Sequence, residues 1–206
     1  METINSEYYL LVKDSAYPSL EYRDSDNYDL SWELECYKPI EMPEASFDLY
    51  LRKPFPRNPK IVDYHRLFGI RHVFSERVKQ AIEELSPVRI GFLPTNIRTK
   101  NNYYENHFIF YSYNLIPCMD VQNSVYTKSS YSTPEQFRAL SVDKLALDSS
   151  KLADIPLPER RIFSLGETTA YTLFHESVIN NIEKLNPKGM HAVSLDVWYS
   201  DISMRL

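Results

Sequence analysis

Glycine is scarce in this sequence, with four residues among 206 against thirteen prolines. Glycine is the usual residue where backbone must approach a phosphate closely, so few places remain for a glycine-rich phosphate loop. Long apolar runs are missing as well, since no stretch approaches the roughly 18–20 residues of a membrane span. The first residues include Glu2 and Glu7 and lack the basic region and apolar run of a signal peptide. We therefore expect a cytoplasmic protein with no membrane partner.

Positive charge is also in short supply. The chain carries 23 Lys and Arg against 28 Asp and Glu, a formal net charge of −5. A general nucleic-acid binder depends on a basic face that neutralises phosphates, so this balance argues against nucleic acid as a partner. Cysteine is limited to Cys36 and Cys118. One disulfide and two free thiols are both compatible with that pair, and the sequence leaves the two states open.

Arrangements that support catalysis are missing too. The sequence has no nucleophile elbow and no Cys-x-x-Cys pair. Its five histidines show no i, i+4 pairing with a third ligand. We therefore predict no catalytic residues, no metal and no cofactor. Cys118 with a distant histidine could form a nucleophile–base pair, but a buried structural thiol beside an aromatic strand is the favoured interpretation. A polar pocket that holds His107 or Cys118 beside a carboxylate would favour an enzyme.

Charge is unevenly distributed along the first part of the chain. Positions 14–48 hold ten acidic residues and two basic ones, whereas positions 49–79 hold eight basic residues and two acidic ones. The simpler interpretation is that the two blocks pair within the fold. The other is that the acidic block remains available to a partner with a basic surface.

A polar stretch of Ser, Asp and Asn inside the acidic block predicts a surface loop. It contains Asp24, Asp26 and Asp29, which lack the regular spacing and the Gly of a calcium loop. Such a loop could enter a basic cleft of another protein and speed the encounter electrostatically. Tyr22 and Tyr28 would then be aromatic anchors, because tyrosine is enriched at protein interfaces.

The clearest helix covers about 75–86. Its apolar residues recur at i, i+3, i+4 and i+7 and so share one face: Val78, Ala81, Ile82 and Leu85. Ser75 precedes the helix as a favourable N-cap, because its hydroxyl can accept from an unpaired backbone N–H. Pro87 follows it and cannot continue it.

Sliding the chain against itself by 100 residues reveals a second copy of this helix. Seven of 14 positions are identical: Phe74/Phe174, Glu76/Glu176, Val78/Val178, Ile82/Ile182, Glu83/Glu183, Leu85/Leu185 and Pro87/Pro187. An apolar stretch follows each copy, which predicts a strand–helix–strand unit present twice on a common sheet. Amphipathic patterning alone is the alternative. His175 stands where the first copy has Ser75, so we expect the second helix to be more weakly capped.

Positions 103–118 alternate like one long strand. Tyr104 and Phe108 would share one face, with His107 and Ile109 on the other. Aromatic residues on both faces predict a strand that is covered on both sides.

Together these segments predict an α+β fold. It would contain a mixed, largely antiparallel sheet with two similar amphipathic helices, at about 75–86 and 175–186, packed on it. We treat 1–206 as a single domain with an acidic N-terminal part at 1–50. The domain continues with a Pro-rich connector at 51–60 and a core at 61–198 that contains the duplicated unit.

Several segments resemble bacterial immunity protein family eleven, which was formerly catalogued as a domain of unknown function and belongs to polymorphic toxin systems. The segments that carry the resemblance are Tyr8–Leu11, Phe68–Ile70, Phe74–Arg77, the 103–120 strand, and Arg161–Leu165 with its following helix. The resemblance is best from about Leu51 to Trp198. The acidic 14–48 region is only loosely covered by it.

The resemblance implies a cytoplasmic protein that binds a cognate toxin and neutralises it stoichiometrically, without catalysis or cofactor. It carries over no particular contact residue. The residues themselves suggest the acidic loop as the toxin contact: Tyr22, Asp24, Asp26, Tyr28 and Asp29. The alternative is a small-ligand-binding module or an enzyme whose site forms only in the fold. Homo-oligomerisation is a third possibility, because exposed aromatic residues also serve self-association.

Overall fold

The computed structural model describes residues 4–22, 38–39, 46–55, 59–67, 71–133, 135–168 and 170–200. In chain order the elements are η1 (Ile4–Glu7), β1 (Tyr8–Lys13), β2 (Leu20–Glu21), β3 (Phe47–Leu51), β4 (Tyr64–Leu67), β5 (Arg71–Ser75), α2 (Glu76–Glu83), β6 (Ile90–Arg98), β7 (Tyr103–Ser112), β8 (Leu115–Ile116), β9 (Val125–Lys128), β10 (Ala139–Lys144), α3 (Ser149–Ala153), α4 (Leu157–Arg160), β11 (Ile162–Leu165), β12 (Thr172–His175), α5 (Glu176–Glu183) and β13 (Met190–Ser194). The fold is α+β, as predicted. None of the helices in these residues is long and apolar enough to cross a membrane.

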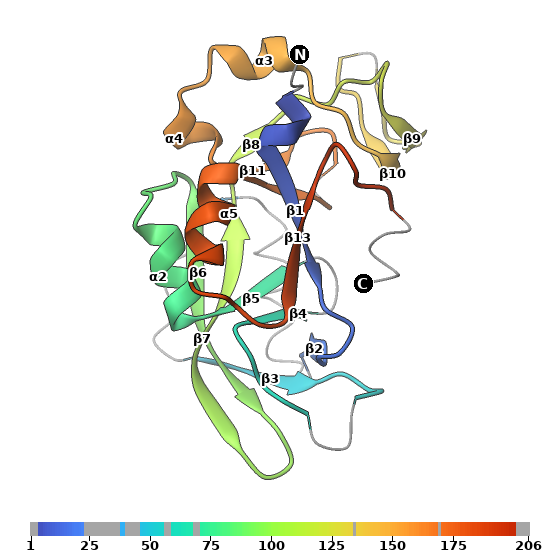
Figure 1. Ribbon diagram of the computed structural model, residues 1–206. Helices are drawn as coiled ribbons and strands as arrows, with labels where there is room; N and C mark the ends of the chain where they lie inside the picture. The colour runs from blue at the N-terminus through green and yellow to red at the C-terminus, as the bar shows by residue number, and fades with distance from the viewer. Residues whose placement is uncertain are drawn as a thin grey trace.

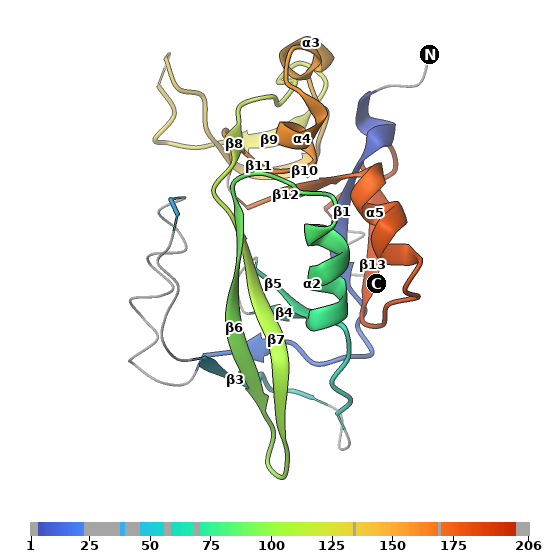
Figure 2. The same ribbon diagram turned by 90° about the vertical axis from the view of Figure 1, so that its left-hand side faces the viewer.

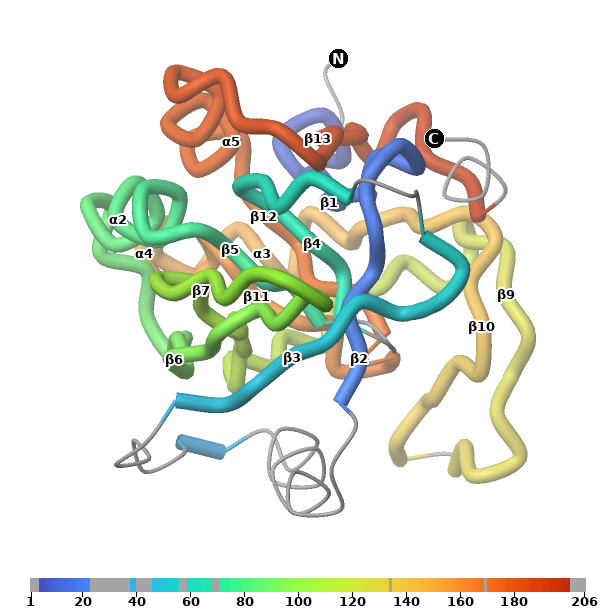
Figure 3. The backbone as a smooth tube through the Cα atoms, turned by 90° about the horizontal axis from the view of Figure 1, so that it is seen from below, coloured from blue at the N-terminus to red at the C-terminus, as the bar shows by residue number. Residues whose placement is uncertain are grey.

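The described strands form one open sheet, one barrel and one separate pair. Five strands lie in the order β13-β1-β12-β11-β8, and six close a barrel in the order β2-β3-β6-β7-β5-β4. β9 and β10 pair with each other and lie to one side, away from α2 and α5 (Figure 3). Among these strands the parallel pairs are β8–β11, β2–β4 and β3–β6. Pairing is therefore mixed and largely antiparallel, as predicted.

The repeat seen in the sequence recurs as a repeat of structure. β5, α2 and β6 are followed 100 residues later by β12, α5 and β13, and the two helices correspond residue for residue. The chain leaves each helix through a left-handed residue, Ser86 with φ 50° and Asn186 with φ 48°. The expectation of a common sheet is wrong. The first copy belongs to the barrel and the second to the five-stranded sheet.

Two further strands complete each copy in the same way. In the barrel, Phe74 of β5 lies between Tyr64 of β4 and Phe108 of β7. In the five-stranded sheet, its counterpart Phe174 of β12 lies between Ile162 of β11 and Tyr9 of β1. β7 and β1 then pair with β6 and β13. Each copy is therefore four strands and a helix, and the N-terminal strand β1 completes the second one.

The two helices lie side by side, in both Figure 1 and Figure 2. Their repeated apolar residues enter one shared cluster together with aromatic residues of both sheets: Val78, Ile82, Val178, Ile182, Phe74, Phe110 and Phe174. Fully burying a side chain of this size contributes about 1.5–3 kcal/mol. The repeated positions therefore join the two halves of the molecule.

Arginine side chains add a reciprocal polar link between the halves. Arg77 of α2 donates to the carbonyl oxygen of Leu185 beyond α5 at 3.1 Å. Arg161, before β11, donates to the carbonyl oxygen of Leu85 beyond α2. The last carbonyls of a helix lack partners inside it and favour cations. Each half therefore completes the helix end of the other.

Asp63 lies at the centre of this junction. Its carboxylate accepts from Arg77 Nε and Nη2 at 2.6 Å each, from Ser75 Oγ at 3.0 Å and from the Lys188 backbone N–H at 2.9 Å. Burial by itself raises the pKa of Asp63, but the hydrogen bonds from Arg77, Lys188 and Ser75 outweigh it and hold that pKa below its ordinary value. Asp63 is therefore ionised at neutral pH.

The side-chain hydrogen bond that caps a helix N-terminus is present in α5 and absent in α2, the opposite of what the sequence predicted. Ser75 occupies the N-cap position of α2, but its hydroxyl donates to Asp63 and makes no cap hydrogen bond. His175 caps α5, because its Nδ1 accepts from the Ser177 N–H at 3.1 Å. The prediction of a weaker second cap was wrong for two reasons. A buried carboxylate competes for the serine hydroxyl, and a neutral imidazole nitrogen is itself an acceptor.

β7 contains a bulge that changes its alternation. The pairing with β6 shifts between Thr95 and Ile97, and Asn106 opposite them has a positive φ of 61°. One extra residue turns every later side chain to the other face. Tyr104 therefore packs into the barrel core and Phe108 into the cluster beside the helices. The prediction that these two share a face was wrong. Both faces are covered from His107 to Ser112, as predicted, but not at Tyr103, Glu105 and Asn106, which are exposed.

Candidate functional site

Two of the buried histidines serve the scaffold. His65 Nδ1 donates to the Pro18 carbonyl at 2.9 Å, and its Nε2 accepts from the Val62 N–H at 3.1 Å. His72 Nδ1 is hydrogen-bonded to the Tyr64 hydroxyl at 2.9 Å. Burial lowers the pKa of His65 to about 4 and that of His72 to about 3, so both are neutral at pH 7. Neither ring is placed to exchange protons with a substrate.

His107 and Cys118 do not form a catalytic pair. His107 lies on β7 beside a polar groove of about 250 Å³, and its Nδ1 donates to the Glu105 carbonyl at 3.0 Å. Cys118 is fully buried in the cluster of the five-stranded sheet, where burial and then the charge of Glu167 raise the pKa of its thiol. A buried neutral thiol is a poor nucleophile. Within the described residues, no three His, Cys, Asp or Glu side chains are grouped to hold a metal ion.

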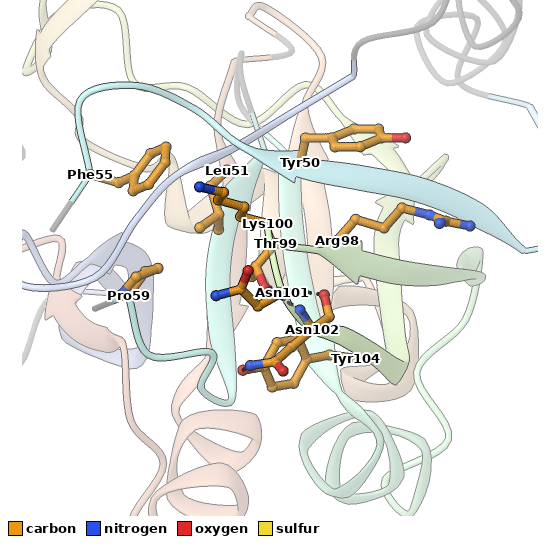
Figure 4. A pocket seen from close by; sticks show the side chains of 10 residues that line it. All are labelled: Tyr50, Leu51, Phe55, Pro59, Arg98, Thr99, Lys100, Asn101, Asn102 and Tyr104. Carbon is orange, nitrogen blue, oxygen red and sulfur yellow. Dashed lines mark hydrogen bonds between the residues drawn. The ribbon is translucent and has the colours of Figure 1, made fainter. Parts of the chain in front are cut away.

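An open pocket of about 550 Å³ lies at the tip of the β6–β7 hairpin, where the hairpin meets β3 (Figure 4). We call it the hairpin-tip pocket and define it by its lining residues: Tyr50, Leu51, Phe55, Pro59, Arg98, Thr99, Lys100, Asn101, Asn102 and Tyr104. Phe55 and Pro59 lie toward one end, Tyr50 and Arg98 toward the other, and Lys100 between them. Aromatic, amide and cationic groups therefore surround one concave surface.

The turn that forms one wall of the hairpin-tip pocket is fixed by hydrogen bonds. The Thr99 backbone N–H donates to the Asn102 carbonyl at 2.9 Å, and the Asn102 N–H donates to Thr99 Oγ1 at 3.0 Å. Asn102 Nδ2 donates to the Tyr104 hydroxyl at 3.2 Å. These hydrogen bonds fix the backbone of the four-residue loop and the side chains of Thr99 and Asn102 before any partner arrives.

The two cationic side chains that line the hairpin-tip pocket, Arg98 and Lys100, differ in their ion-pair partners. Arg98 is paired with Asp48 of β3, and its guanidinium lies 4.8 Å from the ring centre of Tyr103. The hydrogen bond that Arg98 Nε donates to the Asp48 carboxylate raises the pKa of Arg98. Lys100 is exposed at the tip and takes part in no ion pair among the described residues. Arg98 therefore belongs to the barrel wall, while the Lys100 ammonium is unpaired within this described part of the chain.

The structure describes one of the five residues predicted for the acidic contact. Tyr22 follows β2 and packs against the barrel core, and its buried hydroxyl finds no hydrogen-bond partner in the described part of the chain. Burial raises the pKa of that hydroxyl. The other four lie outside the described residues, as does Cys36: Asp24, Asp26, Tyr28 and Asp29. Sequence reasoning missed the hairpin tip, although Lys100-Asn101-Asn102 between two alternating segments is a recognisable turn signal.

Aromatic and cationic groups around an open pocket, with the catalytic candidates buried or engaged elsewhere, suit a protein that binds. The chain matches the model of the Imm11 immunity protein family over residues 3–192 and belongs to that family. This confirms the resemblance seen in the sequence. A search of curated proteins found no match.

Proposed function

We propose that this protein is a cytoplasmic immunity protein that binds a cognate bacterial toxin domain stoichiometrically and thereby neutralises it. The observation that carries the proposal is the match to the Imm11 family, which extends over residues 3–192 of the chain. The mechanism needs no reaction on the immunity protein. Its binding surface covers the part of the toxin that acts on the cell.

The chemistry of the described residues supports binding rather than catalysis. His65 and His72 are neutral and buried, and Cys118 is a buried thiol with a raised pKa. Exposed aromatic and amide groups at the hairpin-tip pocket are of the kind that protein interfaces use. The size of this pocket also falls within the range of small-ligand sites, which keeps a ligand-binding module as the second candidate.

Co-expression with the toxin encoded beside this protein tests the proposal. We expect the two chains to co-purify at equal stoichiometry and growth to be restored to the strain that makes the toxin. A ligand-binding module would give neither result. Absence of both a complex and growth rescue would overturn the proposal.

The acidic stretch is our proposal for one part of the contact: Tyr22, Asp24, Asp26, Tyr28 and Asp29. Converting Asp24, Asp26 and Asp29 together to Asn should weaken toxin binding by about tenfold or more, because steering by opposite charge is lost. The salt dependence of affinity should become shallower as well. A matched control removes three exposed acidic groups elsewhere, with the substitutions Glu135→Gln, Asp154→Asn and Glu183→Gln. Unchanged affinity and unchanged salt dependence would exclude the acidic stretch as a contact.

A further inference from the structure

We propose that the hairpin-tip pocket receives a carboxylate-bearing segment of the toxin and is the anchoring part of the contact surface. The inference rests on the proposed function, since it names where the neutralised partner binds. The described residues offer other exposed apolar side chains, such as Tyr131 and Leu140 around β9 and β10. Neither side chain lines the hairpin-tip pocket or the groove beside His107, so we place the anchor at the hairpin tip.

The size and lining of the hairpin-tip pocket fit a short protein segment. A volume of about 550 Å³ accommodates a few side chains. Phe55 contributes a ring that is 38% exposed at one end, and Tyr103, whose ring centre lies 4.8 Å from the Arg98 guanidinium next to the pocket-lining residues, is 47% exposed. Aromatic rings in such positions dominate interface energetics once a partner removes them from water.

The charge around the hairpin-tip pocket specifies an acidic occupant. Lys100 lines the pocket, and two further exposed lysines are close in sequence to its lining residues: Lys53 comes two residues before Phe55, and Lys60 follows Pro59. Asp48 is the carboxylate nearest to Arg98 and is already paired with it. The whole chain carries a net charge of −5, so this cationic rim is a local reversal of sign. A partner carboxylate is attracted to these lysines.

The rigidity of the hairpin reduces the entropy that binding must overcome. β6 and β7 are paired along their length up to Arg98 and Tyr103, and the turn beyond them is closed by its own hydrogen bonds. A backbone that is already fixed loses less freedom on association. A preformed anchor of this kind is what a tight inhibitor requires.

The position of the hairpin-tip pocket is consistent with a single contact surface. Glu21 of β2 pairs with Tyr50, which lines the pocket, and Tyr22 of the proposed acidic contact follows Glu21 directly. The hairpin also extends beyond the repeated unit: β13 pairs with β1 from Met190 to Ser194, whereas β6 continues to Arg98. Figure 2 shows the hairpin projecting from the body on the side opposite α3. The anchor therefore lies in the part of the fold that the scaffold does not duplicate.

The test is a titration of the purified toxin domain, inactivated for expression, against the full chain. Lys100→Met removes the charge and keeps the length of the side chain, Lys100→Glu reverses the charge, and Phe55→Ala removes the ring. The matched controls on β9 and the loop that follows it are Lys128→Met, Lys128→Glu and Tyr131→Ala. We expect about tenfold weaker binding for Lys100→Met and Phe55→Ala and about hundredfold for Lys100→Glu, with the controls within about twofold. Affinity should also depend less on salt in both Lys100 variants.

The outcomes separate this inference from the proposed function. If the unaltered chain does not bind the toxin, the proposed function fails. If the unaltered chain binds, the pocket variants are compared with their controls at unchanged melting temperatures. Equal affinities would then show that the pocket is not the anchor, while the proposed function stands. Tighter binding by Lys100→Glu would show a basic occupant and overturn the assignment. Loss of self-association without loss of toxin binding would identify a second copy of the chain as the occupant instead, and would overturn it too.

Discussion

Asp63 offers a quantitative test of how the two halves are joined. The substitution Asp63→Asn keeps the size of the side chain and one acceptor oxygen, but it removes the charge that faces Arg77. It also turns an amide toward a guanidinium that can only donate. The Lys188 and Ser75 donors must then share the remaining oxygen.

The expected loss at pH 7 is about 2 kcal/mol of unfolding free energy. A hydrogen bond to a charged group contributes about 1.5–3 kcal/mol, and breaking a fully buried ion pair costs about 3–5 kcal/mol. The Arg77 side chain is 50% exposed while that of Asp63 is 11% exposed, so water screens part of the interaction and the lower range applies.

The same substitution should change the pH dependence of stability. The pKa of Asp63 is lowered in the folded state, and that of an unfolded aspartate is about 3.9. Its contribution is therefore complete above about pH 4 and is lost as the pH falls through the lower, folded value. The difference between the unaltered chain and Asp63→Asn should be constant from pH 7 to 5 and shrink below about pH 4.

Urea unfolding followed by circular dichroism measures both effects. Asp154→Asn, at an exposed carboxylate after α3, is the control and should change stability by less than about 0.5 kcal/mol. A loss for Asp63→Asn no larger than that of the control would refute the junction as described. So would an equal difference at pH 7 and pH 3.

Two further predictions concern the contact between α2 and α5 and the buried thiol of Cys118. Asn181→Ala should lower the unfolding free energy by about 1 kcal/mol more than Asn180→Ala does. Asn181 Nδ2 donates to the Ala81 carbonyl at 2.7 Å across the helix pair, whereas Asn180 is exposed on the same helix. Equal urea midpoints for the two variants would contradict this prediction. In a Cys36→Ser background, Cys118 should resist iodoacetamide at pH 8 in the folded chain and react after unfolding, since burial raises the pKa of its thiol. Mass spectrometry measures the labelling, and rapid modification of the native protein would show that the thiol is not buried.

The sequence alone predicts the elements well where local chemistry decides them. Val78, Ile82 and their counterparts mark buried helix faces through spacing alone, and the shift of 100 residues identifies the repeat. The sequence could not predict that one copy of the repeat belongs to a barrel and the other to an open sheet. That choice depends on long-range pairing, such as Phe47 with Thr95 and Tyr9 with Ser194, which leaves no local signal.

The errors in the prediction have identifiable physical causes. Ser75 is a residue type that favours the N-cap position, but its hydroxyl donates to Asp63, which is distant in the sequence. Asn106 adopts a positive φ that asparagine tolerates, and the bulge reverses the side of Tyr104. The hairpin-tip pocket escaped notice because β3 and the turn at Lys100 meet only in three dimensions. The division into an acidic part, a Pro-rich connector and a core stays a prediction, as does homo-oligomerisation.

Replacing the hairpin turn should separate binding from stability. The second copy of the repeat has no counterpart of the outer hairpin, so the scaffold does not require residues 99–102. Exchanging these four residues for Asn-Gly closes the Arg98–Tyr103 pair with a two-residue turn suited to the twist of the strands. We expect unfolding free energy to change by less than about 1 kcal/mol, because the exchanged residues are exposed or half-buried and contribute no residue to the core clusters. Toxin affinity should fall by at least the tenfold expected for Lys100→Met. A variant that lost stability and affinity together would show that the turn supports the barrel, and one that kept both would place the toxin elsewhere.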